Sequence, residues 1–90
     1  MRRVFIFNSK KDICTNATVV CSAIGKEEYR GTFSFTNGIY VLNPPKKMIL
    51  KIVASTNDEI GEGIIHPNDS TQIIYLKKKT DPPKLEKGTE

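Results

Sequence analysis

The sequence predicts an all-β domain, a sandwich of about seven short strands, and three observations support this. Alternating polar and apolar residues recur in short segments, as in strands with one buried face. Clusters of Gly, Pro, Asn, Asp and Ser separate these segments at the close spacing typical of sandwiches and small barrels. No window long enough for a periodic helix is free of a turn cluster or a β-branched run.

The clearest local signal is a hairpin with its turn at Asn37-Gly38. Residues 32–36 alternate polar and apolar side chains, and residues 39–42 follow as a second strand. Asn-Gly is a strong hairpin signal because both turn residues take positive φ. A two-residue turn pairs Thr36 with Ile39, Phe35 with Tyr40, and Phe33 with Leu42. We expect the side chains of the last two pairs to lie in the core.

Five further strands are predicted between the turn clusters, two of them, residues 16–24 and 47–55, from alternation. They cover residues 3–7, 16–24, 47–55, 60–65 and 71–76. Pro44-Pro45 ends the hairpin, because proline lacks the N–H that a ladder needs. In residues 47–55 the apolar side chains Met48, Leu50, Ile52 and Ala54 share one side. We expect this strand to be central to a sheet, and residues 25–30 to form a loop.

The chain of 90 residues is expected to form one domain, residues 1–76, and a tail, residues 77–90. The tail has two prolines and only one apolar residue, so we expect it to be disordered. No apolar run approaches the roughly 20 residues of a membrane-spanning helix. Four apolar residues after Arg2-Arg3 are also fewer than the 7 to 15 or so of a signal peptide. We therefore expect no membrane span and no signal peptide, and the compartment stays open.

The net charge of +4 is spread along the chain, since residues 1–76 contain nine basic and seven acidic residues. The basic clusters are Arg2-Arg3, Lys10-Lys11, Lys46-Lys47 and Lys77-Lys78-Lys79. We interpret them as solvated loop and edge charges. A nucleic-acid footprint usually shows one dense basic face with stacking aromatics. Nucleic acid is therefore not the expected partner.

The two cysteines, Cys14 and Cys21, give little support for chemistry. On one extended strand they would lie about 23 Å apart, so a bridge would require Cys14 to sit in a turn that folds back. We expect free thiols, with Cys21 buried. The lone histidine, His66, leaves a zinc site short of ligands. Cys14 and His66 are the one conceivable nucleophile and base, but we interpret His66, which precedes a proline in a polar turn, as solvated.

The remaining polar motifs also predict no chemical site. Asp58, Glu59 and Glu62 cluster near two glycines, but their spacing is not that of a calcium loop, and we interpret them as a solvated acidic turn. Asn16 and Asn68 begin N-glycosylation patterns, which matter only in a secreted eukaryotic chain. We predict an absence of catalytic, cofactor-binding and metal-binding residues, and therefore no enzyme.

The segments around the hairpin follow an order seen in a known family. They are residues 12–20, residues 36–42, and Pro44-Pro45 followed by residues 50–54. This order resembles the carboxypeptidase regulatory-like and Cna-B-like domains of the transthyretin-like class, and implies a transthyretin-like or Ig-like β-sandwich. Where the family has Gly and Tyr after the prolines, this chain has Lys46, Lys47 and Met48. The isopeptide of many Cna-B domains is not placed here, because residues 71–76 contain no asparagine.

We therefore expect a non-enzymatic structural or interaction module that binds a protein partner through a sheet edge or loop tips. The resemblance implies an accessory part of a surface, secreted or secretion-machinery assembly. The alternative is a small basic β-barrel that binds nucleic acid. Four aromatic residues, Tyr29, Phe33, Phe35 and Tyr40, distinguish the two hypotheses. Their burial in the core favours a protein partner, whereas an exposed aromatic and basic groove favours nucleic acid.

Overall fold

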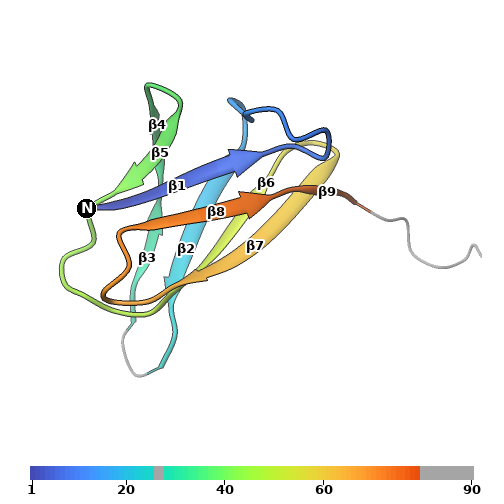
Figure 1. Cartoon of the computed structure of the whole chain (residues 1–90). Coiled ribbons are helices and arrows are strands. Elements are labelled where there is room, and N and C mark those ends of the chain that lie inside the picture. Colours follow the sequence, from blue (N-terminus) through green and yellow to red (C-terminus); the bar gives the residue numbers. More distant parts are fainter. Residues whose placement is uncertain (26–27, 80–90) are drawn as a thin grey trace, which may run out of the picture.

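The computed structural model describes residues 1–25 and 28–79, and their nine strands form two sheets (Figure 1). Sheet A has the order β4 (Ser34–Thr36), β5 (Ile39–Leu42), β1 (Arg2–Phe7), β8 (Thr71–Tyr75). Sheet B has the order β3 (Arg30–Thr32), β2 (Thr18–Ala23), β6 (Leu50–Ser55), β7 (Glu59–Ile65), β9 (Lys77–Lys78). The described residues contain no helix, and hence none that could cross a membrane. The predicted all-β sandwich is confirmed.

The β4–β5 hairpin has the predicted turn and register. Asn37 and Gly38 have φ values of 51° and 84°, and Phe35 pairs with Tyr40. Phe33 and Tyr40 are buried as expected, and Leu42 packs against the core. The prediction for Phe35 was wrong, because this side chain is 41% exposed. Its ring lies against the Tyr40 ring at the edge of sheet A, with centroids 4.8 Å apart.

Two segments pass from one sheet to the other. The single strand predicted for residues 32–36 is divided at Phe33, whose N–H donates to the Val19 carbonyl at 2.8 Å. The chain thus leaves sheet B as β3 and enters sheet A as β4. At the other side, Leu76 separates β8 of sheet A from β9 of sheet B. Strands that switch sheets in this way form the corners of a sandwich.

The core lies between the sheets, and β6 is the middle strand of sheet B, as predicted. The alternation predicted for residues 47–55 is confirmed, since Met48, Leu50, Ile52 and Ala54 are buried. The core residues come from both sheets and from the connections between them. They are Val4, Ile6, Cys14, Val19, Cys21, Phe33, Tyr40, Met48, Leu50, Ile52, Ala54, Ile65, Ile74 and Leu76.

Strands β1 and β8 pair in parallel, with Phe5 opposite Ile73 and Phe7 opposite Tyr75. Both strands therefore end at the same edge of the molecule (Figure 1). The predicted tail begins too early, because Lys77–Lys78 form β9 against β7. The strand forms there because sheet B presents an open edge to the chain as it leaves sheet A. The remainder of the predicted tail, residues 80–90, lies outside the described residues, as do residues 26–27 of the predicted loop.

Candidate functional site

Both cysteines are free, as expected, and both are buried, although burial was predicted only for Cys21. Cys14 lies beside the end of β1, where its N–H donates to the Ile6 carbonyl at 2.9 Å. His66 belongs to the β7–β8 connection, which lies at the start of β1, because the Arg3 N–H donates to the Ser70 carbonyl. Cys14 and His66 are therefore at opposite ends of β1. The structure does not bring the one conceivable nucleophile and base together.

The thiol of Cys21 is not poised for nucleophilic chemistry. Burial raises its pKa, and a hydrogen bond with the Gly31 backbone opposes this only in part. Reactive cysteines need a lowered pKa, since the thiolate is the nucleophile. Cys21 therefore acts as a small apolar core residue, as predicted from its position in the second strand.

The interpretation of Glu59 as part of a solvated acidic turn was wrong. Glu59 is 9% exposed, and its carboxylate accepts hydrogen bonds from the Ser9 N–H at 3.0 Å and the Ser9 hydroxyl at 2.7 Å. Asp58 accepts from the Thr56 hydroxyl at 3.2 Å, and Glu62 lies 3.7 Å from the Lys51 ammonium. Within residues 1–25 and 28–79, no cluster of three or more His, Cys, Asp or Glu could hold a metal ion.

Arg2 was also wrongly interpreted as a solvated edge charge. Its side chain is 7% exposed, and its guanidinium donates to the Asp69 carbonyl at 2.5 Å and the Pro67 carbonyl at 2.6 Å. Arg2 thus holds the β7–β8 connection against the start of β1. Asn68, in the same connection, and Asn16 are exposed, and the Asn16 amide oxygen accepts from the Cys14 thiol at 3.3 Å.

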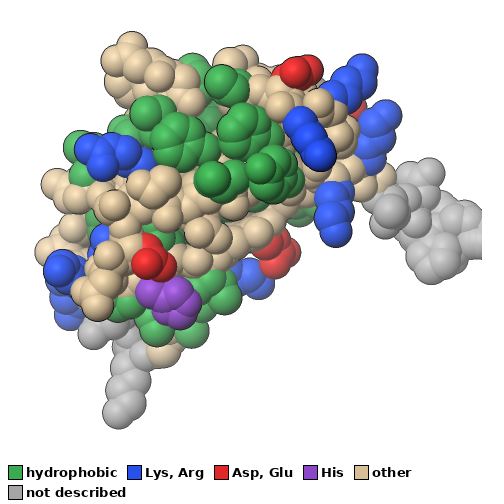
Figure 2. Space-filling model, viewed as in Figure 1, with side chains coloured by type: hydrophobic (Ala, Val, Ile, Leu, Met, Phe, Trp, Pro, Cys, Tyr) green, Lys and Arg blue, Asp and Glu red, His purple; other side chains and the backbone are tan. Residues whose placement is uncertain are grey.

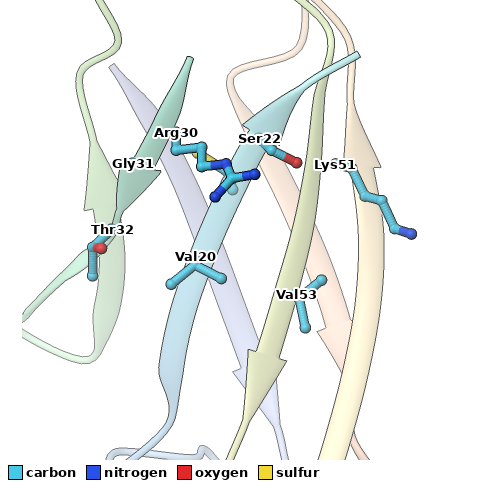
Figure 3. A pocket seen from close by; sticks show the side chains of 8 residues that line it. Val20, Ser22, Arg30, Gly31, Thr32, Lys51 and Val53 are labelled. Atoms are coloured by element: carbon cyan, nitrogen blue, oxygen red, sulfur yellow. The ribbon is translucent and has the colours of Figure 1, made fainter. Parts of the chain in front are cut away.

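The outer face of sheet B carries a shallow hollow (Figure 3). Ser22 is the cross-strand neighbour of both Arg30 and Lys51, which places two cations in one row. Figure 3 shows the Arg30 side chain lying across β2, whereas Lys51 points away from it. The Lys51 ammonium is instead near Glu62. Because the two cations do not converge, the hollow is not arranged as an anion site.

The outer face of sheet A is more distinctive. Five apolar side chains, here called the apolar face, lie on neighbouring strands: Phe5, Phe7, Val41, Ile73 and Tyr75. They point away from the core because Val4, Ile6, Tyr40 and Ile74 occupy the alternate, buried positions. Figure 2 shows hydrophobic side chains gathered over this side of the molecule.

Much of the apolar face is exposed to solvent, and the contact of its apolar side chains with water is energetically unfavourable. Ile73 and Tyr75 are 51% and 57% exposed, and Phe5, Phe7 and Val41 are half-buried. The rings of Phe7 and Tyr75 stack with centroids 5.4 Å apart and an interplanar angle of 24°. A contiguous apolar patch rimmed by polar residues marks an interaction site more often than scattered apolar residues do.

Positive charge flanks the apolar face at one end. The four strands of sheet A contain no acidic residue, and Arg3 is exposed on the same face. Because β1 and β8 run in parallel, the basic clusters that follow each of them meet at one end of the molecule. We call this cluster the cationic end, and it consists of Lys10, Lys11, Lys77, Lys78 and Lys79. Figure 2 shows basic side chains gathered beside the apolar patch.

Comparison of the chain with protein-family models, curated proteins and solved structures gives no match. A functional site must therefore be argued from the geometry of this chain. Sequence reasoning did not single out Phe5, Phe7, Ile73 or Tyr75. The continuous apolar runs in residues 4–7 and 73–76 were a signal that could have found them, because such runs make a strand apolar on both faces.

Proposed function

We propose that this domain is a non-enzymatic interaction module that binds a protein partner through the apolar face of sheet A. The observation that carries the proposal is the row of outward-facing apolar side chains on β1 and β8, half-buried on β1 and exposed on β8. Apolar and aromatic side chains form the centres of protein interfaces, where they contribute most of the binding energy. The proposal replaces the sheet edge or loop tips expected from the sequence with the face of a sheet.

The packing of the aromatic side chains favours a protein over nucleic acid. Phe33 and Tyr40 are in the core, and Tyr29 packs against it. Phe35 is 41% exposed, but its ring lies against that of Tyr40. The half-buried ring of Phe7 and the exposed ring of Tyr75 stack on each other, so each offers less open ring surface to a base. Their neighbours on the apolar face are apolar rather than basic. This composition suits the apolar surface of a protein better than the stacked bases of a nucleic acid.

The resemblance to carboxypeptidase regulatory-like and Cna-B-like domains extends the proposal to the cellular context. Domains of that class serve as accessory parts of surface, secreted or secretion-machinery proteins. In such an assembly a small sandwich contributes a rigid binding face, because paired strands fix the positions of side chains such as Phe7 and Tyr75. A transthyretin-like module with one interaction face is therefore the function that we propose.

The test compares Ile73 on sheet A with Ile64 on sheet B, which are 51% and 46% exposed. A photoreactive amino acid is placed at either position in the full chain, and proteins cross-linked in native cells are identified by mass spectrometry. The captured partner is purified, and its affinity is measured by calorimetry for Ile73→Asp and Ile64→Asp. We expect Ile73→Asp to weaken binding at least about tenfold, since the aspartate carboxylate would lose its contact with water at the centre of the interface.

The Ile64→Asp variant is the matched control, and we expect it to bind as the wild-type protein does. Both variants should keep the wild-type melting temperature, because both side chains point to solvent. A partner captured at position 64 rather than 73, or an affinity that Ile73→Asp leaves unchanged, would contradict the proposed function.

A further inference from the structure

We propose that the partner contributes an acidic segment, whose carboxylates lie on the cationic end while its apolar residues cover the apolar face. This inference rests on the proposed function and names the chemistry of the partner. It follows from three observations, namely the excess of positive charge at the cationic end, the absence of acidic residues from sheet A, and the position of both surfaces at the ends of β1 and β8.

The charges of the cationic end are not neutralised within the described part of the chain. Lys10, Lys11, Lys77 and Lys78 form no ion pair with a described residue. Lys79 donates from Nζ to the Thr56 carbonyl at 2.9 Å, which leaves its charge in place.

The acidic residues nearby do not balance these lysines. Glu59 is buried, and its carboxylate accepts two hydrogen bonds from Ser9. Asp12 and Asp58 are the remaining acidic residues in the described segments that adjoin the cationic end. Positive charges therefore outnumber negative ones beside Phe7 and Tyr75.

Charge complementarity selects the occupant of the apolar face. A second copy of the chain would bring the same basic residues, including Arg3, towards each other, and like charges across an interface cost binding energy. An acidic partner would instead gain from each lysine and would be steered towards the face. The occupant is therefore a different protein whose binding segment combines acidic with apolar residues.

The dimensions of the surface define a suitable probe. The apolar face extends from Phe5 to Phe7 along β1 and across to Tyr75 on β8, with the cationic end directly beyond. An extended peptide of about 12 residues, at roughly 3.3 Å per residue, is long enough to cover both surfaces. Random peptides of this length, displayed on phage, are therefore selected on the immobilised full chain. Phage that also bind the Ile73→Asp variant are removed.

The selection has three outcomes. Enrichment of peptides that join several Asp or Glu residues to apolar ones supports the inference. Enrichment of neutral or basic peptides that still require Ile73 overturns the inference and leaves the proposed function standing. Failure to enrich any peptide that requires Ile73 contradicts the proposed function itself, and the inference falls with it.

Charge reversal then tests the place of the acidic residues. Lys10→Glu with Lys78→Glu changes the cationic end, whereas Arg30→Glu with Lys47→Glu makes the same change of net charge elsewhere. The fluorescein-labelled selected peptide is titrated with each protein at about 50 mM salt, where surface charges are weakly screened. We expect roughly tenfold weaker binding for the first pair and less than about twofold for the second. Equal losses for both pairs would overturn the inference.

The same fluorescence titration distinguishes other anionic occupants. A labelled oligouridine and vesicles of phosphatidylcholine with phosphatidylserine replace the peptide, at about 150 mM salt to screen nonspecific attraction. We expect weak binding that Tyr75→Ala leaves unchanged. Tight binding of the oligouridine or of the vesicles that Tyr75→Ala abolishes would overturn the inference in favour of nucleic acid or of a membrane surface.

Discussion

The Tyr40 hydroxyl links sheet A to the segment that precedes β2. It donates to the Cys14 carbonyl at 2.9 Å and accepts from the Ala17 N–H at 3.1 Å. The Tyr40 ring is 2% exposed, so the two backbone groups that it satisfies have little access to water. A buried tyrosine usually needs such a partner for its hydroxyl, and here the partners are two backbone groups of one connection.

At this residue we predict that Tyr40→Phe destabilises the fold. The change leaves the Cys14 carbonyl and the Ala17 N–H without the hydroxyl, at a cost of about 2 kcal/mol in the free energy of unfolding. Urea denaturation measures this cost. The control is Tyr75→Phe, because Tyr75 is 57% exposed and its hydroxyl makes no hydrogen bond to the described residues. Equal unfolding free energies for the two variants would refute the role of the Tyr40 hydroxyl.

From the raised pKa of the Tyr40 hydroxyl we also predict a loss of stability at alkaline pH. Burial raises the pKa of its hydroxyl, the hydrogen bond with Ala17 lowers it, and Cys14 raises it further, with a net rise. The folded state therefore holds this proton more tightly than the unfolded state, in which tyrosine titrates near pH 10. The stabilisation is fully present below about pH 10 and is lost as the pH rises through the folded pKa.

The measurement compares urea midpoints at about pH 8 and pH 10.5, on either side of the unfolded tyrosine pKa. The wild-type midpoint should fall more between these values than that of Tyr40→Phe, which lacks the titrating group. Cys21 and Tyr29 also have raised pKa values, but the wild-type protein and Tyr40→Phe both retain these residues, so their contributions cancel in the comparison. Parallel pH profiles for the two proteins would count against a raised Tyr40 pKa.

Among the elements, β7 and β8 approach each other closely because β7 carries glycines on its inner side. A Cβ at Gly61 would lie 2.8 Å from Ile74 Cγ2, 2.9 Å from Leu76 Cδ2 and 3.0 Å from the Tyr75 carbonyl oxygen. The two glycines that the sequence placed near an acidic cluster are therefore packing residues. They let a strand of sheet A lie against a strand of sheet B.

We predict that Gly61→Ala destabilises the domain by about 1 to 3 kcal/mol, the usual cost of overpacking. The added methyl group meets the Tyr75 backbone, which cannot move as a side-chain end can. Gly63→Ala is the matched control, because the atoms nearest to its Cβ would be side-chain atoms of Ile74 and Gln72, at 3.1 Å or more. Thermal unfolding of both variants checks the prediction, and a lower melting temperature for Gly63→Ala would contradict it.

At the scale of the whole molecule, the segment after β8 connects the two sheets. The chain crosses from sheet A to sheet B at Leu76, and β9 then pairs with Glu59 and Ile60 of β7. Beyond β9, the Lys79 N–H donates to the Asp58 carbonyl at 2.9 Å. Residues 77–79 thus hold an edge of sheet B that would otherwise be open.

We therefore predict that truncation after Leu76 lowers the melting temperature relative to truncation after Lys79. The shorter protein loses the β9 pairing and both Lys79 hydrogen bonds, to Asp58 and Thr56. Each bond contributes about 1 kcal/mol, and a domain of this size loses roughly 4 to 8 °C per kcal/mol. Differential scanning calorimetry of the two proteins measures the difference. Identical melting temperatures would show that β9 does not stabilise the sandwich.

Local sequence determined most of the strands. Alternation along residues 47–55 was enough to identify the buried side of β6, and Asn37-Gly38 was enough to fix the register of β4 with β5. These signals are local because a strand exposes successive side chains to opposite faces and a two-residue turn sets the pairing of its neighbours. The prediction for Phe35 was wrong because alternation shows which side chains share a face but does not show how far the core extends along that face.

Tertiary structure decided the candidate site. The parallel pairing of β1 with β8 joins segments some seventy residues apart, and it alone brings Phe7 next to Tyr75 and the lysines after each strand to one end. It also decided that Arg2 and Glu59 are buried, since their partners are distant in sequence. The physical reason is that side-chain periodicity records which face of a strand is apolar, whereas the burial of that face depends on which other strands cover it.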